Sequence, residues 1–192
     1  MNSYIKPVDS DKYYRLLNHG PTVMVSANCG GVDNVMTASW VCVLDFSPTK
    51  VTMVLDKASK TREFIEKSGT FMIQVPTVSM LQSVYDAGHM SLSKDPDKLS
   101  KCGISLFRFE EFDLPAVQGC SAWLACKLIP EPKNQETYDL LIGEVVGAWA
   151  DERVFDGENW IFDKADTKLR SIHYATNGCF YAIGELLPLG RK

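Results

Sequence analysis

Short runs of β-forming residues, separated by turn residues, constrain this 192-residue chain more than any other feature of its sequence. The turn signals are Gly30-Gly31, residues 47–49, Gly69, Pro76, residues 130–132 and Asp156-Gly157. Between them we expect strands over residues 22–28, 34–45, 51–55, 70–75, 120–129, 140–150 and 179–183. Many short strands in a chain of this length predict an antiparallel barrel or sandwich.

Helical patterning is sparse by comparison. We expect short helices over residues 11–18, 59–67 and 78–87, the second of them ended by Gly69. The strands do not alternate with helices, and no Gly-x-Gly-x-x-Gly run occurs, which argues against a Rossmann dinucleotide domain. We therefore expect residues 1–192 to form a single, mainly β domain.

The composition argues against several classes of partner. The chain has 20 Lys and Arg against 24 Asp and Glu, a net charge of −4, so we expect no nucleic-acid partner. No apolar run approaches the roughly 20 residues that span a bilayer, and the N-terminal residues lack the apolar segment of a secretion signal. We therefore expect a cytoplasmic protein that does not bind membranes.

The cysteines and histidines show no metal-ligand spacing. Neither Cys-x-x-Cys nor His-Glu-x-x-His occurs, so we expect no metal site. Cys42, Cys126 and Cys179 lie in apolar segments, where a reduced cysteine behaves as a small core residue.

The segment 34–45 places small polar residues on an otherwise apolar strand. Alternate side chains of a strand share a face. Met36, Ala38, Trp40, Cys42 and Leu44 are therefore expected on a core face, and Thr37 and Ser39 on the opposite face. Such a pair is either solvent-exposed or lines a site where a flat ligand approaches the backbone.

The start of the second expected helix concentrates positive charge. Lys57, Lys60 and Arg62 surround a helix start at Ser59, where cations oppose the helix dipole. A bound phosphate, held by free N–H groups, by the hydroxyls of Ser59 and Thr61 and by these cations, would compensate. The alternative is a solvated helix face of mixed charge, because Arg62–Glu66 and Glu63–Lys67 are i,i+4 pairs.

These two segments together resemble the flavin reductase-like, FMN-binding split-barrel family, in particular its flavoredoxin-related branch. The resemblance rests on Asn34-x-Met36-Thr37-Ala38-Ser39-Trp40, on Pro48, and on Ser59-Lys60-Thr61-Arg62-x-x-Ile65 followed by Gly69-x-Phe71. It continues more loosely through Gly88, Ser91, Asp97-Lys98 and Gly103 to His173-Tyr174, Phe180 and Gly184-Glu185.

The resemblance implies a six-stranded antiparallel split β-barrel with a few flanking helices, working as a homodimer with FMN near the subunit interface. It implies that the isoalloxazine is lined by Asn34, Met36, Thr37, Ala38 and Ser39, and that the phosphate is held by Ser59, Lys60, Thr61 and Arg62. Trp40 is interpreted as core. His173 and Tyr174 would close the site, although His173 is equally well explained as a structural residue.

The chain departs from the family pattern at two places. Gln74 stands where Asn is common, so Gln74 is given no ligand role, and the loop 87–91 differs from the usual pattern. His89 in that loop is a flavin neighbour or a surface histidine.

The resemblance implies an NAD(P)H:flavin oxidoreductase in which the cofactor carries the chemistry, so no catalytic side chain is expected. One alternative is a flavoredoxin-type electron carrier that keeps FMN bound and passes electrons to a protein partner. Another is a cofactor-free binding barrel.

Overall fold

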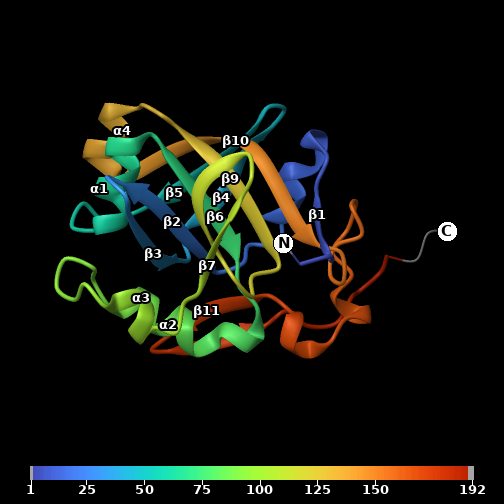
Figure 1. Ribbon diagram of the computed structural model, residues 1–192. Coiled ribbons are helices and arrows are strands. Elements are labelled where there is room, and N and C mark those ends of the chain that lie inside the picture. The colour runs from blue at the N-terminus through green and yellow to red at the C-terminus, as the bar shows by residue number, and fades with distance from the viewer. Residues whose placement is uncertain (1, 190–192) are drawn as a thin grey trace.

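The computed structural model describes residues 2–189 and has an antiparallel sheet at its centre (Figure 1). The strands follow the order β3-β2-β6-β9-β10-β5-β4, and β1 pairs with the end of β10. Their bounds are β1 Ile5–Pro7, β2 Val23–Cys29, β3 Val32–Ala38, β4 Val41–Phe46, β5 Thr49–Val54, β6 Thr70–Val75, β9 Ala122–Ile129 and β10 Leu140–Asp151. The predicted mainly β, antiparallel split-barrel class is confirmed. Among the described residues this sheet has eight strands, two more than the expected six.

Two small sheets and short helices surround the main sheet. The small sheets pair β7 (Leu106–Phe109) with β8 (Phe112–Val117) and β11 (Ile172–Thr176) with β12 (Cys179–Ala182). The α-helices are α1 Lys60–Ser68, α2 Leu81–His89, α3 Lys98–Lys101 and α4 Pro132–Tyr138. The 3-10 helices are η1 Ser10–Leu16, η2 Val78–Met80, η3 Phe162–Lys164 and η4 Thr167–Leu169. In Figure 1, α2, α3 and β11 lie below the sheet, while α1 and α4 lie beside its upper part.

Strand β6 is buried on both faces. Phe71 and Ile73 belong to one hydrophobic core and Met72 to another, and each of the three is fully buried. A strand between two cores has no polar face, which explains the continuous apolar sequence here. Gln74, also fully buried, donates from Nε2 to Ser26 Oγ (2.8 Å) and accepts from the Val117 N–H. Its side chain therefore ties β6 to β2 and β8.

Glycine in β10 allows a close approach across the sheet. A Cβ atom at Gly143 would lie 2.5 Å from Phe71 Cζ, a distance that real Cβ contacts do not reach. The Phe71 ring thus packs directly on the β10 backbone, and β10 in turn pairs with β9, β5 and β1.

The expected single strand over residues 34–45 is wrong in one respect, because it is two strands. β3 pairs with β2 and β4 pairs with β5, at opposite ends of the strand order, and the chain passes between them at Ser39-Trp40. The alternation of faces does not continue through this break. The expected core face is confirmed for Ala38, which is buried, and for Met36, which packs against the same core. It is wrong beyond the break, because Trp40 is 72% and Leu44 53% exposed.

Other expected elements agree with the structure to within a few residues. The hairpin loop between β2 and β3 carries Gly30 and Gly31 at positive φ, and Gly69 ends α1 at φ 72°. The expected first helix is a 3-10 helix. Cys126 is buried as expected, but Cys42 and Cys179 are exposed, which corrects their assignment to the core. No helix within residues 2–189 is long and apolar enough to cross a membrane.

Candidate functional site

Strand β3 lies against the beginning of helix α1. Asn34 Nδ2 donates to Thr61 Oγ1 (2.9 Å), and Ser59 Oγ donates to Met36 Sδ (3.1 Å). The two sequence motifs, 34–39 and 59–62, are therefore neighbours in space. Asn34 is 1% exposed, and its Oδ1 atom has no hydrogen-bond partner in the described structure. A buried acceptor without a partner is uncommon and marks this contact as a candidate ligand-binding position.

The first turn of α1 leaves backbone donors available. Ser59 is the N-cap and its Oγ accepts from the Arg62 N–H, while the Glu63 N–H donates to the Ser59 carbonyl. The first N–H groups of a helix have no intrahelical partner, so those of Lys60 and Thr61 remain available for an acceptor outside the helix.

The positive charges near this helix start are paired with protein carboxylates. Lys57 contacts Glu136 (3.0 Å), Lys60 contacts Glu63 (2.7 Å), and Glu63 also contacts Lys67 (2.6 Å). The hydrogen bonds from Lys60 and then Lys67 lower the pKa of Glu63 to about 2. This end of the helix therefore has a face of mixed charge. The carboxylates compensate the unfavourable interaction between the cations and the positive end of the helix dipole.

Arg62 is buried and structural. It is 4% exposed, and its Nη1 donates to the Leu55 carbonyl (2.9 Å) and to Asp139 Oδ1 (2.6 Å). Its Nη2 donates to the Gln135 carbonyl (2.7 Å), and its Nε to Glu66 (3.0 Å). The expected direct contact of Arg62 with a phosphate is therefore wrong. Its guanidinium instead joins α1 to the segment around α4 and the start of β10.

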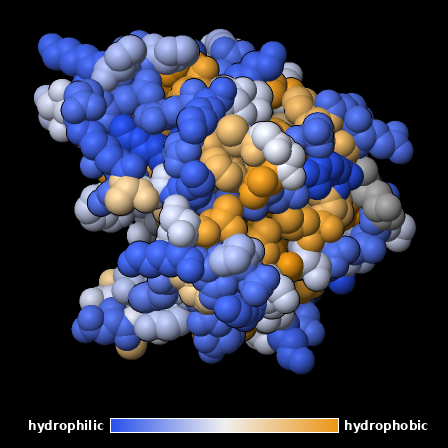
Figure 2. All heavy atoms as spheres, turned by 60° about the vertical axis from the view of Figure 1, so that its left-hand side comes forward, coloured by the Kyte–Doolittle hydropathy of each residue, from blue (hydrophilic) through white to orange (hydrophobic). Residues whose placement is uncertain are grey.

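A pocket of about 250 Å³ opens between β3, α2 and the β11–β12 hairpin. It is lined by Thr22, Thr37, Ser39, Val84, Tyr85, Gly88, His89, Tyr174 and Phe180. Figure 2 shows a notch at the left of the molecule, between an upper and a lower part. Thr37 and Ser39 both line this pocket; Thr37 is half-buried, whereas Ser39 is exposed, so their contact with a flat ligand stays a prediction.

Close packing of α2 on β3 shapes the pocket floor. Thr37 Oγ1 donates to the Val84 carbonyl (2.6 Å), and a Cβ atom at Gly88 would lie 3.4 Å from Thr37 Cβ. The Tyr85 and His89 rings lie 4.1 Å apart. His89 is exposed and lines this pocket, so both of its interpretations stay predictions.

Some lining residues carried no signal in the sequence. Thr22, Val84 and Tyr85 sit in ordinary strand and helix patterns, and only the packing of α2 on β3 brings them together. Thr22 Oγ1 accepts from the Tyr174 N–H (2.7 Å), and the Tyr174 and Phe180 rings meet edge to face at 5.2 Å. Tyr174 lines the pocket, and its expected role in closing a flavin site stays a prediction.

His173 faces away from this pocket and is a structural residue, which corrects its assignment to the site. Its Nδ1 lies 3.0 Å from the Gly20 carbonyl, and its ring lies 5.9 Å from that of His19. Neighbouring residues on a strand point to opposite faces, so Tyr174 and His173 cannot both face the pocket. Within residues 2–189, no three His, Cys, Asp or Glu side chains are grouped to hold a metal ion.

Comparisons with known proteins agree with this geometry. Residues 14–168 match the model of the flavin reductase like domain family. A solved structure from Shewanella baltica, described as an FMN-binding domain of a flavin reductase-like enzyme, is 59% identical with a TM-score of 0.96, over 97% of each chain.

Two further relatives extend the comparison. The uncharacterized protein YddH of Escherichia coli is 40% identical over 187 residues, 96% of this chain and 97% of that protein. The flavoredoxin of Desulfovibrio vulgaris has the same fold, with a TM-score of 0.74 at 23% identity, over 98% of this chain and 93% of that one. The chain belongs to the flavin reductase-like domain family.

Proposed function

We propose that this chain, acting as one unit over residues 1–192, binds FMN and transfers a hydride from NAD(P)H to flavin. The observation that carries the proposal is the contact of β3 with the start of α1, through Asn34–Thr61 and Met36–Ser59, beside the pocket at Thr37. The description of the Shewanella baltica relative as an FMN-binding domain supports it.

The donors at the start of α1 fit a phosphate monoester. The N–H groups of Lys60 and Thr61 have no intrahelical partner, and the dipole of the helix favours an anion there. Ser59 is half-buried beside them, and the Lys60 ammonium can leave Glu63, because an exposed ion pair is worth only about 0–1 kcal/mol. We propose that Ser59, Lys60 and the Thr61 N–H hold the phosphate, and that Arg62 positions the helix.

The pocket and the adjoining strand fit a flat ring. Met36, Thr37, Ala38 and Ser39 form the strand end that faces the ligand in this proposal, and Asn34 Oδ1 offers a buried acceptor without a protein partner. When bound, FMN supplies the hydride chemistry, which requires no catalytic side chain. The protein orients the ring against β3 and excludes water with the aromatic rings of Tyr174 and Phe180.

The test begins with the visible spectrum of the purified full-length chain before and after FMN is added. We expect a saturable shift of the flavin bands, followed by many turnovers when NADH or NADPH and excess free flavin are supplied. A single stoichiometric reduction would indicate an electron carrier instead. If the chain does not take up FMN, the proposal is wrong and the alternative function, a cofactor-free binding barrel, is favoured.

Matched lysine variants on one helix test the phosphate site. We expect Lys60→Gln to weaken FMN binding about tenfold, because a charged hydrogen bond contributes roughly 1.5 kcal/mol or more. Lys67→Gln, at the other end of α1 and 61% exposed, is the control and should leave the affinity unchanged. Equal effects of the two substitutions on FMN affinity would exclude the start of α1 as the phosphate-binding site.

We also propose that the protein is a homodimer. Strand β4 is at the end of the strand order, and its side chains Leu44 and Phe46 are 53% and 67% exposed. Trp40, just before this strand, is exposed as well. The paired residues Asp45, Lys50, Glu144 and Lys127 form a row of alternating charge across β4, β5, β10 and β9. A row of alternating sign is complementary to its own antiparallel copy, which favours a two-fold partner over an unrelated protein.

A further inference from the structure

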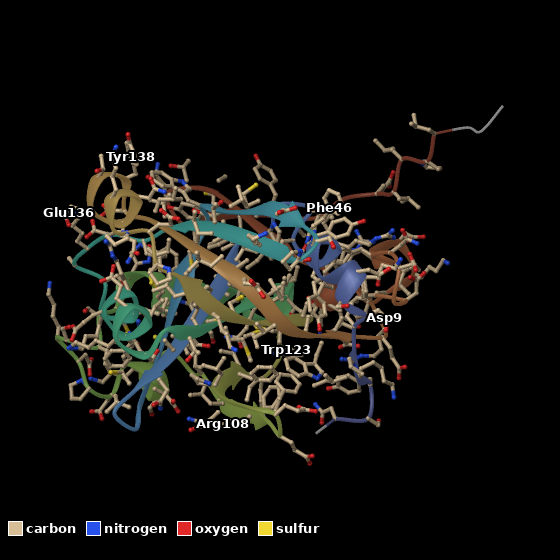
Figure 3. The ribbon with its side chains drawn as sticks, turned by 90° about the horizontal axis from the view of Figure 1, so that it is seen from above. Asp9, Phe46, Arg108, Trp123, Glu136 and Tyr138 are labelled. Atoms are coloured by element: carbon tan, nitrogen blue, oxygen red, sulfur yellow. The ribbon has the colours of Figure 1, made fainter. Side chains whose placement is uncertain are left out.

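A second pocket, of about 290 Å³, lies away from the site described above and shares no lining residue with it. It is formed by the N-terminal segment with β1, by the β7–β8 hairpin, by the loop before β9 and by the end of β10. The residues lining it are Asn2, Tyr4, Ile5, Ser79, Phe107, Arg108, Gln118, Gly119, Cys120, Trp123, Asp151, Arg153 and Leu169. Figure 3 shows Arg108 and Trp123 on the side of the molecule opposite Phe46 and Tyr138.

Aromatic side chains form the apolar walls of this pocket. The Trp123 ring is 1% exposed and is held in place by its Nε1–H, which donates to the Val117 carbonyl (3.0 Å). Phe107 meets it edge to face, with ring centroids 5.8 Å apart. Burial raises the pKa of Cys120, so its thiol adds a neutral surface to the same wall. Walls fixed in this way are suited to a planar apolar body.

The polar part of the pocket contains a preorganised guanidinium. Asp151, 2% exposed, accepts from Arg153 Nε (2.9 Å) and Nη2 (2.6 Å), and the Arg153 guanidinium lies over the Tyr4 ring at 3.8 Å. Its Nη1 makes no hydrogen bond to the described residues. A guanidinium fixed from two sides loses little entropy when its remaining N–H groups bind a ligand.

A second arginine repeats this arrangement. Arg108 donates from Nε to Asp113 (2.6 Å) and from Nη2 to Asp33 (2.8 Å), and its Nη1 is likewise unused within the described structure. Both aspartates lie outside the lining of the pocket. The lining itself carries two arginines and one aspartate, a formal charge of +1, in a chain whose net charge is −4.

From these observations we propose that the pocket binds a small aromatic monocarboxylate. The volume lies at the lower end of ligand sites and suits a single or fused ring with one substituent. The ring would lie against the wall formed by Phe107 and Trp123, and the carboxylate would accept charge-assisted hydrogen bonds from the unused N–H groups of the arginines. Occupancy is independent of flavin because the two pockets share no residue.

The test uses the full-length chain with benzoate, its neutral isostere benzamide, and acetate, which has no ring. Calorimetry should give saturable binding of benzoate, with benzamide and acetate each at least about tenfold weaker. In a nitrogen-15 correlation spectrum, the Nε1–H signal of Trp123 should move with benzoate, while that of Trp40 should not. Equal binding of benzamide, or no saturable binding of benzoate, would overturn the proposal.

Two variants locate the carboxylate. Arg108→Gln, at a position 37% exposed, keeps the fold and should weaken benzoate binding about tenfold. Arg153→Lys keeps a positive charge beside Asp151, but it should weaken benzoate binding to a similar extent because the planar guanidinium donors are lost. Lys6→Gln, on β1 but outside the lining and 53% exposed, is the matched control and should have no effect. Competition between benzoate and FMN would place benzoate in the other pocket and would also refute the proposal.

Discussion

Arg62 shows how one buried charge can organise a site without touching its ligand. Burial lowers the pKa of Arg62, but the hydrogen bonds with Asp139 and Glu66 outweigh it, and the net effect raises the pKa. Two carbonyl groups and two carboxylates accept from a guanidinium that is almost entirely shielded from water. The side chain therefore fixes the position of the helix whose first turn is proposed to bind phosphate.

Replacing this arginine should destabilise the fold strongly. We expect Arg62→Gln to lower the free energy of unfolding by about 3 kcal/mol, the lower end for a broken buried pair, because its carboxylate partners are about one-third exposed and regain water. Urea unfolding measures the change. Lys67→Gln, an exposed position on the same helix, should cost less than about 0.5 kcal/mol. A loss of that small size for Arg62→Gln would contradict the structural role.

Trp40 provides a direct probe of where the flavin binds. It is 72% exposed and directly follows Ser39 of the pocket lining, while Trp123 and Trp149 are buried. We expect FMN to quench the emission of Trp40, and Trp40→Phe to lose most of that quenching while still binding FMN. Quenching of the same extent in the variant would place the flavin away from the end of β3.

At the scale of elements, β4 is the least protected strand of the sheet. Its side chains alternate between half-buried and exposed, and its free edge ends the strand order. Natural proteins usually protect such an edge with charges, proline or a covering segment. Here the exposed positions include Leu44 and Phe46, which is the pattern of a surface that a partner covers.

The proposed homodimer therefore depends on this strand. We expect Phe46→Glu to shift the protein towards monomer in sedimentation velocity, because a buried carboxylate without a partner opposes association. Tyr138→Glu is the matched control, since Tyr138 is 63% exposed at the end of α4 (Figure 3), and should not change the sedimentation coefficient. A Phe46→Glu protein that sediments as the wild type does would exclude this face from the interface.

At the scale of the whole molecule, His19 joins segments from both halves of the chain. It follows η1, and its ring packs edge to face on Trp160 (4.9 Å) and near Phe162 (5.6 Å), with Nε2 3.0 Å from Ser171 Oγ. Burial, and then the nearby His173, lower the pKa of His19 to about 3. The folded protein therefore holds this imidazole neutral well below its usual range.

This half-buried histidine predicts a pH dependence of stability. Below about pH 6.5 the unfolded chain takes up a proton at His19 that the folded chain does not, so stability falls as the pH decreases towards 3. At about pH 5 the cost is about 2 kcal/mol relative to pH 7. In urea unfolding, His19→Gln should lose that part of the dependence, and His89→Gln, at an exposed position, should keep it. Identical pH profiles for His19→Gln and the wild type would contradict the assignment.

Local pattern was sufficient for most elements of this fold. Residues 70–75 were predicted as a strand, and β6 has the same bounds, because an apolar β-branched run between turn residues has few other solutions. Ser59 and Gly69 similarly bound α1, since capping depends on side-chain chemistry and positive φ rather than on distant contacts. The contact of motif 34–39 with motif 59–62 followed from the family resemblance.

Periodicity failed where the chain passes from one edge of the sheet to the other. The segment 34–45 carries no turn signal, so nothing in it reveals that β3 ends before Ser39, and the alternation of its residues places Trp40 and Cys42 in the core by mistake. Arg62 and His173 were misplaced for a similar reason. The partners of Arg62 come from segments distant along the chain, and the direction of His173 depends on the packing of His19.

By itself, then, the sequence determined most strands of the main sheet, the ends of α1 and the family, because these depend on neighbours within a few residues or on motifs that are contiguous in the chain. The tertiary structure alone decided which cations are already paired, which apolar side chains remain exposed, and which residues surround each pocket. Those properties depend on side chains that come together only when distant segments pack.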